Sequence, residues 1–264
     1  MTTDPRIGEF RTSDDLTLRY YSWGEVGELP PVLLLHGFAV HARSNWEDPG
    51  VVAALLGHGR HVVALDARGH GASDRPHDPA RYGEVRMARD VTELIDVLGV
   101  GEVHLAGYSM GAVVALLATA ADRRVTRLVT GGVGAGVVEV GGLDRRAIPT
   151  ELVTAALNAE DPADAPAQAA GFRLLADAVG ADRQALVAQL TAAFRGPMPL
   201  ADIRVPFLVL AGSEDPLAVR PEVLADAVAG AELSVLPGDH LTVVRDPRFA
   251  AAVAAFLSAR DKRG

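Results

Sequence analysis

Residues 104–115 read HLAGYSMGAVVA and place Ser109 between Gly107 and Gly111. The pattern Gly-x-Ser-x-Gly alone is weak, because a serine flanked by glycines also occurs in ordinary turns. Its surroundings carry more information. Residues 103–106 read as a short buried strand, and an apolar run that reads as a helix follows the motif. A serine held between a strand and a helix is typical of a catalytic nucleophile.

The turn between this strand and the expected helix, residues 111–121, explains the two glycines. A sharp strand-to-helix turn strains the backbone at Ser109, and glycine removes the side chains that would clash on either side. The turn lifts the hydroxyl clear of the sheet, near the positive end of the helix dipole. We therefore interpret Ser109 as a nucleophile.

Composition narrows the classes of protein to consider. With 264 residues, 49% of them hydrophobic and 22% charged, the chain suits a large α/β domain and is not disordered. The net charge of −9 and the pI near 5.3 argue against nucleic acid or an anionic membrane as the main partner. The absence of cysteine excludes disulfides and a thiol nucleophile.

The apolar segments indicate where in the cell the protein is located. Residues 1–15 carry early charges and lack the apolar centre of a secretory signal. The longest apolar run, the helix after Ser109, is about half of the roughly 20 residues that a membrane span needs. We expect a cytoplasmic protein without a membrane partner.

Strands and helices alternate along most of the chain. An N-terminal hairpin is expected at residues 7–12 and 16–23. Further strands are expected at 32–35, 60–65, 103–106, 125–130, 206–211 and 233–236. Helices are expected at 51–56, 85–98, 111–121 and 221–228, and after Asp246. This alternation is typical of a mostly parallel sheet that helices cover on both faces.

The alternation stops between residues 132 and 199, where no strand is convincing. Three helices are expected there instead, at 144–158, 165–179 and 182–194. We interpret residues 132–199 as a small helical cap, inserted into an α/β core made of residues 1–131 and 200–264.

A serine hydroxyl needs a base to become a nucleophile at neutral pH, and the base needs an acid to orient it. In doubly wound sheets such groups lie in loops after strands. His240 follows the strand at 233–236 and is the one histidine after the serine motif. Asp215 follows the strand at 206–211. The order nucleophile, acid, base is the one expected for this motif.

Two other carboxylates stand close to these positions. Glu214 precedes Asp215 by one residue, so a small difference in the loop would exchange them. Asp239 is adjacent to His240, and a side chain rarely reaches around to the ring of its own neighbour. We predict Asp215 as the acid and keep Glu214 as the nearest alternative.

Attack on a carbonyl creates an oxyanion, which fixed hydrogen-bond donors must stabilise. The backbone N–H of Met110, next to the nucleophile, is one expected donor. The second is the N–H of Phe38, in the loop His36-Gly37-Phe38 after the strand at 32–35, where glycine permits close approach. The alternative is that this loop is only a tight turn.

Five segments together resemble the α/β-hydrolase fold family over nearly the whole chain. They are HGF at 36–38, LDARGHGASDRP at 65–76, GYSMG at 107–111, GSEDP at 212–216 and GDH at 238–240. The resemblance implies a catalytic triad at Ser109, Asp215 and His240. It implies oxyanion donors at Phe38 and Met110, and a helical cap. In the second segment, Arg68 and His70 are expected to be structural.

Serine at the motif narrows the implied activity. It does not fit haloalkane dehalogenases and epoxide hydrolases, which use aspartate there, and a single HG fits lipases with an HGGG loop poorly. A carboxylic ester hydrolase working through an acyl-enzyme on Ser109, without cofactor or metal, is the first expectation. Lactonases, C–C bond (diketone) hydrolases and cofactor-free haloperoxidases or perhydrolases are alternatives on the same triad. A small-ligand binding protein without turnover is the alternative of another class.

The expected cap also bears on the substrate. Its larger apolar side chains favour an apolar roof and hence a small molecule with an apolar acyl part, although they can equally pack the helices together. They are Leu143, Leu152, Leu157, Phe172, Leu174, Leu175 and Phe194. Trp46 either lines the pocket or only packs against the next helix.

Overall fold

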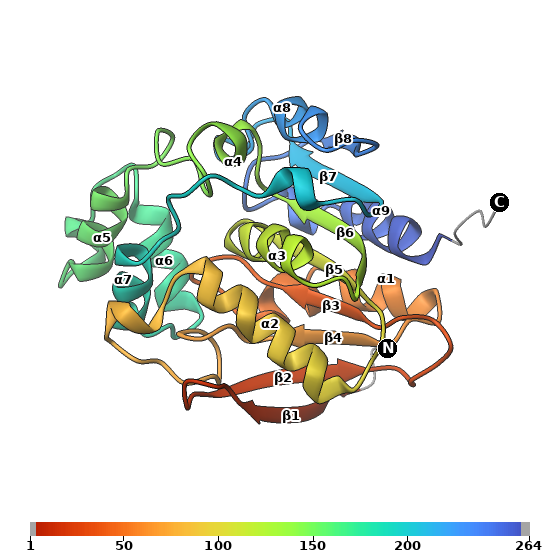
Figure 1. Ribbon diagram of the computed structural model, residues 1–264. Coiled ribbons are helices and arrows are strands. Elements are labelled where there is room, and N and C mark those ends of the chain that lie inside the picture. Colours follow the sequence, from red (N-terminus) through yellow and green to blue (C-terminus); the bar gives the residue numbers. More distant parts are fainter. Residues whose placement is uncertain (1–3, 260–264) are drawn as a thin grey trace.

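Residues 4–259, the part of the chain that the computed structural model describes, form one eight-stranded sheet with helices on both faces (Figure 1). The strands are β1 (Arg6–Arg11), β2 (Thr17–Trp23), β3 (Val32–Leu35), β4 (Val62–Leu65), β5 (Val103–Tyr108), β6 (Val125–Gly131), β7 (Phe207–Gly212) and β8 (Glu232–Leu236). Their order in the sheet is β1-β2-β4-β3-β5-β6-β7-β8. Strand β2 pairs antiparallel with β1 and β4, and all other neighbours are parallel. The predicted fold class, a mostly parallel sheet after an N-terminal hairpin, is confirmed.

Alternate residues of each central strand enter two separate hydrophobic layers. Leu33 and Leu35 of β3 pack into the layer that contains α2 (Glu84–Leu98) and α3 (Met110–Ala121). Val32 and Leu34 pack into the opposite layer, with α1 (Val51–Gly57) and α9 (Pro247–Ser258). Strands that are buried on both sides need apolar residues at every position, which explains the continuous Val and Leu runs in the sequence.

The ends of two core helices follow local signals. Gly99 ends α2 in the left-handed region, at φ 65°, and its N–H bonds to the carbonyl oxygens of Ile95 and Asp96. At the start of α9, the Asp246 carboxylate accepts a 2.8 Å bond from the N–H of Arg248. The end of α2 at Leu98 and the start of α9 after Asp246 agree with the sequence prediction.

Apart from the helices between residues 132 and 199, which are described below, the other helical elements of residues 4–259 are short. One more α-helix, α8 (Pro221–Asp226), lies between β7 and β8. A π-helical turn, η1, spans Arg43–Glu47. Four 3-10 turns are η2 (Pro79–Arg81), η3 (Pro162–Asp164), η4 (Leu200–Asp202) and η5 (Val243–Arg245).

Residues 132–199 contain no strand, as predicted, and the helices there are α4 (Ala135–Glu139), α5 (Thr150–Asn158), α6 (Ala170–Ala178) and α7 (Arg183–Thr191). Helices α5, α6 and α7 gather beyond one end of the sheet (Figure 1). The three predicted helices are there, but each is shorter than predicted. Helix α5 begins only after Pro149, whose extended backbone (ψ 134°) cannot continue a helix.

The prediction for this segment was wrong in two other respects, one helix boundary and one missing helix. Helix α6 begins at Ala170, five residues late, after a turn in which the Ala169 N–H bonds to the Pro166 carbonyl. The Gly-rich stretch after β6 also holds the short helix α4, which the sequence did not predict. Across residues 4–259, no helix has the length and apolar character needed to cross a membrane.

Candidate active site

Ser109 stands at the junction between β5 and α3 with φ 54° and ψ −116°, a backbone conformation that residues with side chains rarely adopt. A Cβ atom on Gly107 would lie 2.2 Å from the carbonyl oxygen of Gly111, and one on Gly111 would lie 2.1 Å from that of Leu35. Neither position has room for a side chain. The glycines therefore let β3, β5 and α3 approach closely enough to hold the strained turn.

His240 lies between the serine and an acid. Its Nε2 is 3.0 Å from Ser109 Oγ. Its Nδ1 is 2.8 Å from Asp215 Oδ2 and 3.0 Å from Oδ1. Asp215 follows β7 and His240 follows β8, so the parallel strands bring the three side chains to one edge of the sheet. The structure thus brings together the three side chains that the sequence singled out.

The hydrogen bonds favour one tautomer of the imidazole. Asp215 is 4% exposed, and a buried carboxylate beside Nδ1 favours a proton on that nitrogen. The Nε2 lone pair then faces the hydroxyl of Ser109, which is the geometry a general base requires. The Asp215 carboxylate also accepts a 2.8 Å bond from the N–H of Leu217, which fixes its position.

Two neighbours hold the histidine loop. The Tyr108 hydroxyl donates a 2.6 Å hydrogen bond to the His240 carbonyl. Gly132 has φ 70°, and a Cβ there would lie 2.9 Å from His240 Cε1. The ring is therefore packed directly against the backbone where the chain leaves β6.

The other two carboxylates considered from the sequence lie elsewhere. Glu214 is exposed to solvent, whereas Asp215 beside it points inward. Asp239 accepts hydrogen bonds from the N–H groups of Leu241 (2.9 Å) and Thr242 (2.8 Å), and so stabilises its own turn. The carboxylate beside the imidazole is that of Asp215.

The two predicted oxyanion donors flank the serine. Met110 is the first residue of α3, where a helix has N–H groups without helical partners. The loop of Phe38 reaches the serine through Gly37, where a Cβ would lie 3.4 Å from Ser109 Cβ. Among residues 4–259, neither the Met110 nor the Phe38 N–H is bonded to a protein acceptor.

Buried polar side chains fix the loop of Phe38, and sequence reasoning missed two of them. Asn45 Oδ1 accepts a 2.9 Å bond from the N–H of Gly37. His36 Nε2 accepts a 3.0 Å bond from the N–H of Ala67. His70 Nε2 accepts a longer one, 3.3 Å, from the N–H of Ala39, in keeping with the structural role expected for it. No local pattern signals the roles of Asn45 and His36, because their partners lie on separate turns of the chain.

His36 and His70 make stability depend on pH. Burial lowers the pKa of His36 to about 4 and that of His70 to about 3. Below the unfolded pKa of about 6.5 the unfolded chain takes up protons that these folded, neutral rings do not. The free energy of unfolding is therefore expected to fall as the pH drops from about 6.5 towards 4, by up to about 1.4 kcal/mol per pH unit for each ring.

Urea unfolding of the variant His70→Gln, measured between pH 7 and 4.5, tests this dependence. The amide can still accept the Ala39 N–H but does not titrate, so the fall should be shallower than in the wild type. His58→Gln, at an exposed position, is the matched control and should keep the wild-type slope. Equal slopes for His70→Gln and the wild type would contradict the assignment.

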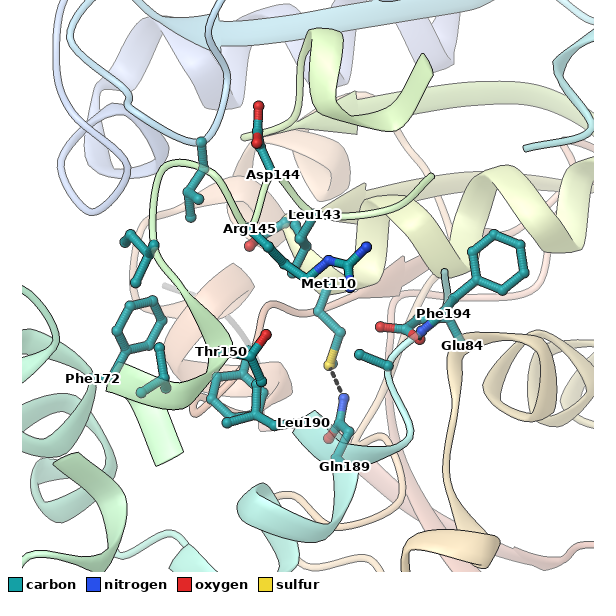
Figure 2. Close-up of a pocket in the computed structure, with 16 residues that line it drawn as sticks. Glu84, Met110, Leu143, Asp144, Arg145, Thr150, Phe172, Gln189, Leu190 and Phe194 are labelled. Atoms are coloured by element: carbon teal, nitrogen blue, oxygen red, sulfur yellow. Dashed lines mark hydrogen bonds between the residues drawn. The ribbon is translucent and has the colours of Figure 1, made fainter. Parts of the chain in front are cut away.

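A cavity that is open to solvent lies beside Ser109, Met110 and Phe38, and residues of the 132–199 segment cover it (Figure 2). Of the apolar side chains expected to form a roof, three line it: Leu143, Phe172 and Phe194. The other four do not. Leu157 packs in the core and Leu174 is 60% exposed, for example.

Polar side chains also line this cavity, and the sequence prediction of an apolar roof missed them. They are Glu84, Asp144, Arg145, Thr150 and Gln189. Trp46 is 1% exposed and packs with α1 and α9, so it belongs to the core and not to the pocket wall.

Comparisons with known proteins bear on the fold. Residues 30–133 match the family described as alpha/beta hydrolase fold. The curated 3-oxoadipate enol-lactonase 2 of Acinetobacter baylyi is 25% identical over 90% of this chain and 91% of its own length. A non-heme chloroperoxidase of Streptomyces lividans is 36% identical, but over 47% of this chain and 43% of its own. The match to two other curated relatives likewise spans only 28% and 36% of their lengths, so this chain covers less than half of each of them.

A solved structure matches more completely. The crystal structure of a hydrolase from Pseudomonas aeruginosa PA01 has a TM-score of 0.77 and 30% sequence identity, and the match covers 96% of this chain and 99% of that one. Because a relative of this identity is matched over nearly its whole length, the chain belongs to the α/β-hydrolase fold family.

Proposed function

We propose that this protein is a serine hydrolase that cleaves carboxylic esters through an acyl-enzyme on Ser109. The observation that carries the proposal is the continuous hydrogen-bond chain from Asp215 through His240 to the serine hydroxyl, with gaps of 2.8 and 3.0 Å. A buried carboxylate, an oriented imidazole and a strained serine at the floor of a cavity are the parts that acyl transfer requires.

In the first half of the proposed reaction, His240 Nε2 takes the hydroxyl proton as Ser109 Oγ attacks the acyl carbon. Asp215 stabilises the imidazolium that forms. The negative charge on the former carbonyl oxygen is stabilised by the N–H groups of Met110 and Phe38, two fixed donors beside the serine. Collapse of the tetrahedral intermediate breaks the C–O bond, and the imidazolium gives its proton to the departing alcohol.

The second half repeats this sequence with water. His240 accepts a proton from water, which attacks the acyl-enzyme, and the carboxylic acid leaves as Ser109 regains its proton. We further propose that residues 132–199 act as a cap that selects small-molecule substrates for a core of residues 1–131 and 200–264. The cap supplies much of the cavity wall but none of the three reacting groups.

Lactone hydrolysis is the second candidate. A lactone is a cyclic ester, so the same groups would open it by the same steps. The full-length likeness to an enol-lactonase favours this candidate over chemistry that needs peroxide or cleaves a C–C bond.

Labelling with a fluorophosphonate probe tests the proposal. The wild type should be phosphonylated on the tryptic peptide that contains Ser109, because only an activated serine attacks phosphorus quickly. Ser109→Ala should abolish labelling, whereas Ser213→Ala, which removes a nearby exposed hydroxyl, should not. A folded wild type that stays unlabelled, or a Ser109→Ala variant that is labelled equally, would overturn the proposal.

A further inference from the structure

Tyr108 is the last residue of β5, directly before Ser109, and its side chain reaches His240. The hydroxyl donates a 2.6 Å hydrogen bond to the His240 carbonyl, 132 positions away in the chain. The ring also lies beside the imidazole, with the two ring centroids 5.2 Å apart and the planes inclined by 39°. One side chain thus contacts both the backbone and the ring of His240.

The backbone of His240 has little other support. Its two chain neighbours are both exposed to solvent. Among the described residues, the Tyr108 hydroxyl is the one hydrogen-bond partner of the His240 backbone. The nearest bond from the loop after β7 runs from the Glu214 N–H to the Gly238 carbonyl, two residues earlier in the chain. The main chain at His240 is therefore fixed to the core chiefly through the tyrosine.

Tyr108 is itself held rigidly. It is 4% exposed, and its ring packs edge-on against Phe249 of α9, with the centroids 5.9 Å apart. A Cβ on Gly131 would lie 2.8 Å from its Cδ2, so backbone closes one side of the ring. Burial, together with the charges of Asp215 and Asp239, raises the pKa of the hydroxyl well above its usual range. The phenol therefore stays protonated, and a donor, at neutral pH.

Such a bond matters because the hydrogen bonds of the imidazole change during the proposed reaction. Once Ser109 Oγ is acylated it has no proton to share with Nε2, so the bond between serine and histidine is lost. Asp215 then holds the ring, but that bond does not fix the main chain. The Tyr108 bond joins two groups that neither gain nor lose a proton, so it can persist through every step.

Resting on the function proposed above, we infer that Tyr108 is a positioning residue, which holds His240 where Nε2 can exchange a proton with Ser109 or with water. Because Tyr108 and Ser109 are adjacent, a single peptide unit fixes the base relative to the nucleophile. A shift of the strained turn would then move both groups together. Proton transfer requires this, because it depends steeply on the distance between the groups.

The alternative is that a buried phenol simply needs an acceptor, whatever residue supplies it. Tyr82 provides the comparison. It is 6% exposed and also donates a 2.6 Å bond to a carbonyl, that of Pro76, but it contacts no residue of the triad and does not line the cavity. The two tyrosines make the same kind of bond, and Tyr108 differs in what it holds.

Tyr108→Phe and Tyr82→Phe are therefore a matched pair of variants. Each removes one buried hydroxyl and keeps the ring, so both should fold and lose similar thermal stability. Tyr108→Phe should lower kcat for p-nitrophenyl butyrate roughly tenfold, with KM within about twofold, because a misplacement of about 1 Å can cost about 10²-fold and the ring packing remains. Tyr82→Phe should keep kcat within about twofold of the wild type.

The Nδ1–H proton of His240 supplies a second readout, which needs no turnover. Because it is shared with the buried Asp215 carboxylate at 2.8 Å, it should give a strongly deshielded NMR resonance that exchanges slowly with water. Its absence from the spectrum of His240→Gln would assign it. The resonance should broaden or vanish in Tyr108→Phe, through faster exchange, and should stay unchanged in Tyr82→Phe.

These measurements separate the positioning role from the proposed function. An unchanged resonance in Tyr108→Phe, a loss confined to KM, or a fall in kcat that Tyr82→Phe reproduces would overturn the inference. A changed resonance without ester turnover by the wild type would support Tyr108 as the residue that holds His240 and reject the hydrolase. Turnover by the wild type, with kcat and resonance unaltered in Tyr108→Phe, would support the hydrolase and reject the positioning role.

Discussion

Ester turnover by Ser109→Ala is expected to fall by roughly 10⁴- to 10⁶-fold, because the acyl-enzyme cannot form without the hydroxyl oxygen. The cavity and the N–H groups of Met110 and Phe38 remain, so substrate affinity should change little. Alanine keeps the same Cβ atom, so it adds no strain at φ 54°. The measurement is kcat with p-nitrophenyl butyrate at saturation.

Two control measurements test whether the loss of activity comes from the missing hydroxyl. The thermal midpoint of Ser109→Ala should stay close to that of the wild type, since the removed oxygen bonds to His240 alone among the described side chains. Residual activity should also be insensitive to the fluorophosphonate. A variant that retains more than about one-hundredth of the wild-type kcat would show that Ser109 is not the nucleophile, since loss of a nucleophile costs far more than that.

Asp215→Asn is expected to lower kcat roughly 10³- to 10⁴-fold, the scale known when a triad acid of this type becomes an amide. The asparagine NH₂ would favour a proton-free Nδ1, which moves the ring proton to Nε2, where it faces the serine. His240 could then no longer accept the hydroxyl proton. The hydrogen bond from the Leu217 N–H can persist on the amide oxygen, so the loop should keep its shape.

The neighbouring acid supplies the control for this prediction. Glu214→Gln makes the same chemical change one residue away, at an exposed position, and should leave kcat within about twofold of the wild type, as surface substitutions usually do. Steady-state kinetics on both variants distinguishes the two acids. A larger loss in Glu214→Gln than in Asp215→Asn would reverse the assignment.

The sequence predicted most of the core because the relevant signals are local. Val32–Leu35 and Phe207–Gly212 are apolar at nearly every position, as strands buried on both faces must be. The turn at Ser109 was predictable for a steric reason: the space beside Gly107 and Gly111 is filled by backbone oxygens. Signals of this kind are contained in a few consecutive residues.

What the sequence could not predict depends on contacts between distant segments. The bond of Asn45 to Gly37 spans eight residues, and that of His36 to Ala67 spans 31. Gln189 reads simply as one polar residue of a helix, and only the folded chain places it against Met110, 79 positions away. Residues 144–148 (DRRAI) include good helix formers, so propensity alone gave no helix boundary before Pro149.

The order of the strands has an evolutionary consequence. Ser109, Asp215 and His240 follow β5, β7 and β8, whereas the segment that covers the cavity is one continuous stretch between β6 and β7. Exchange of that stretch would replace most of the wall that faces a ligand and leave the reacting atoms untouched. Gly132 marks where such a graft has to begin, because the histidine ring rests against its backbone. Under the proposed function, recombination at the two ends of this stretch would therefore change substrate selection and leave the proposed catalytic groups in place.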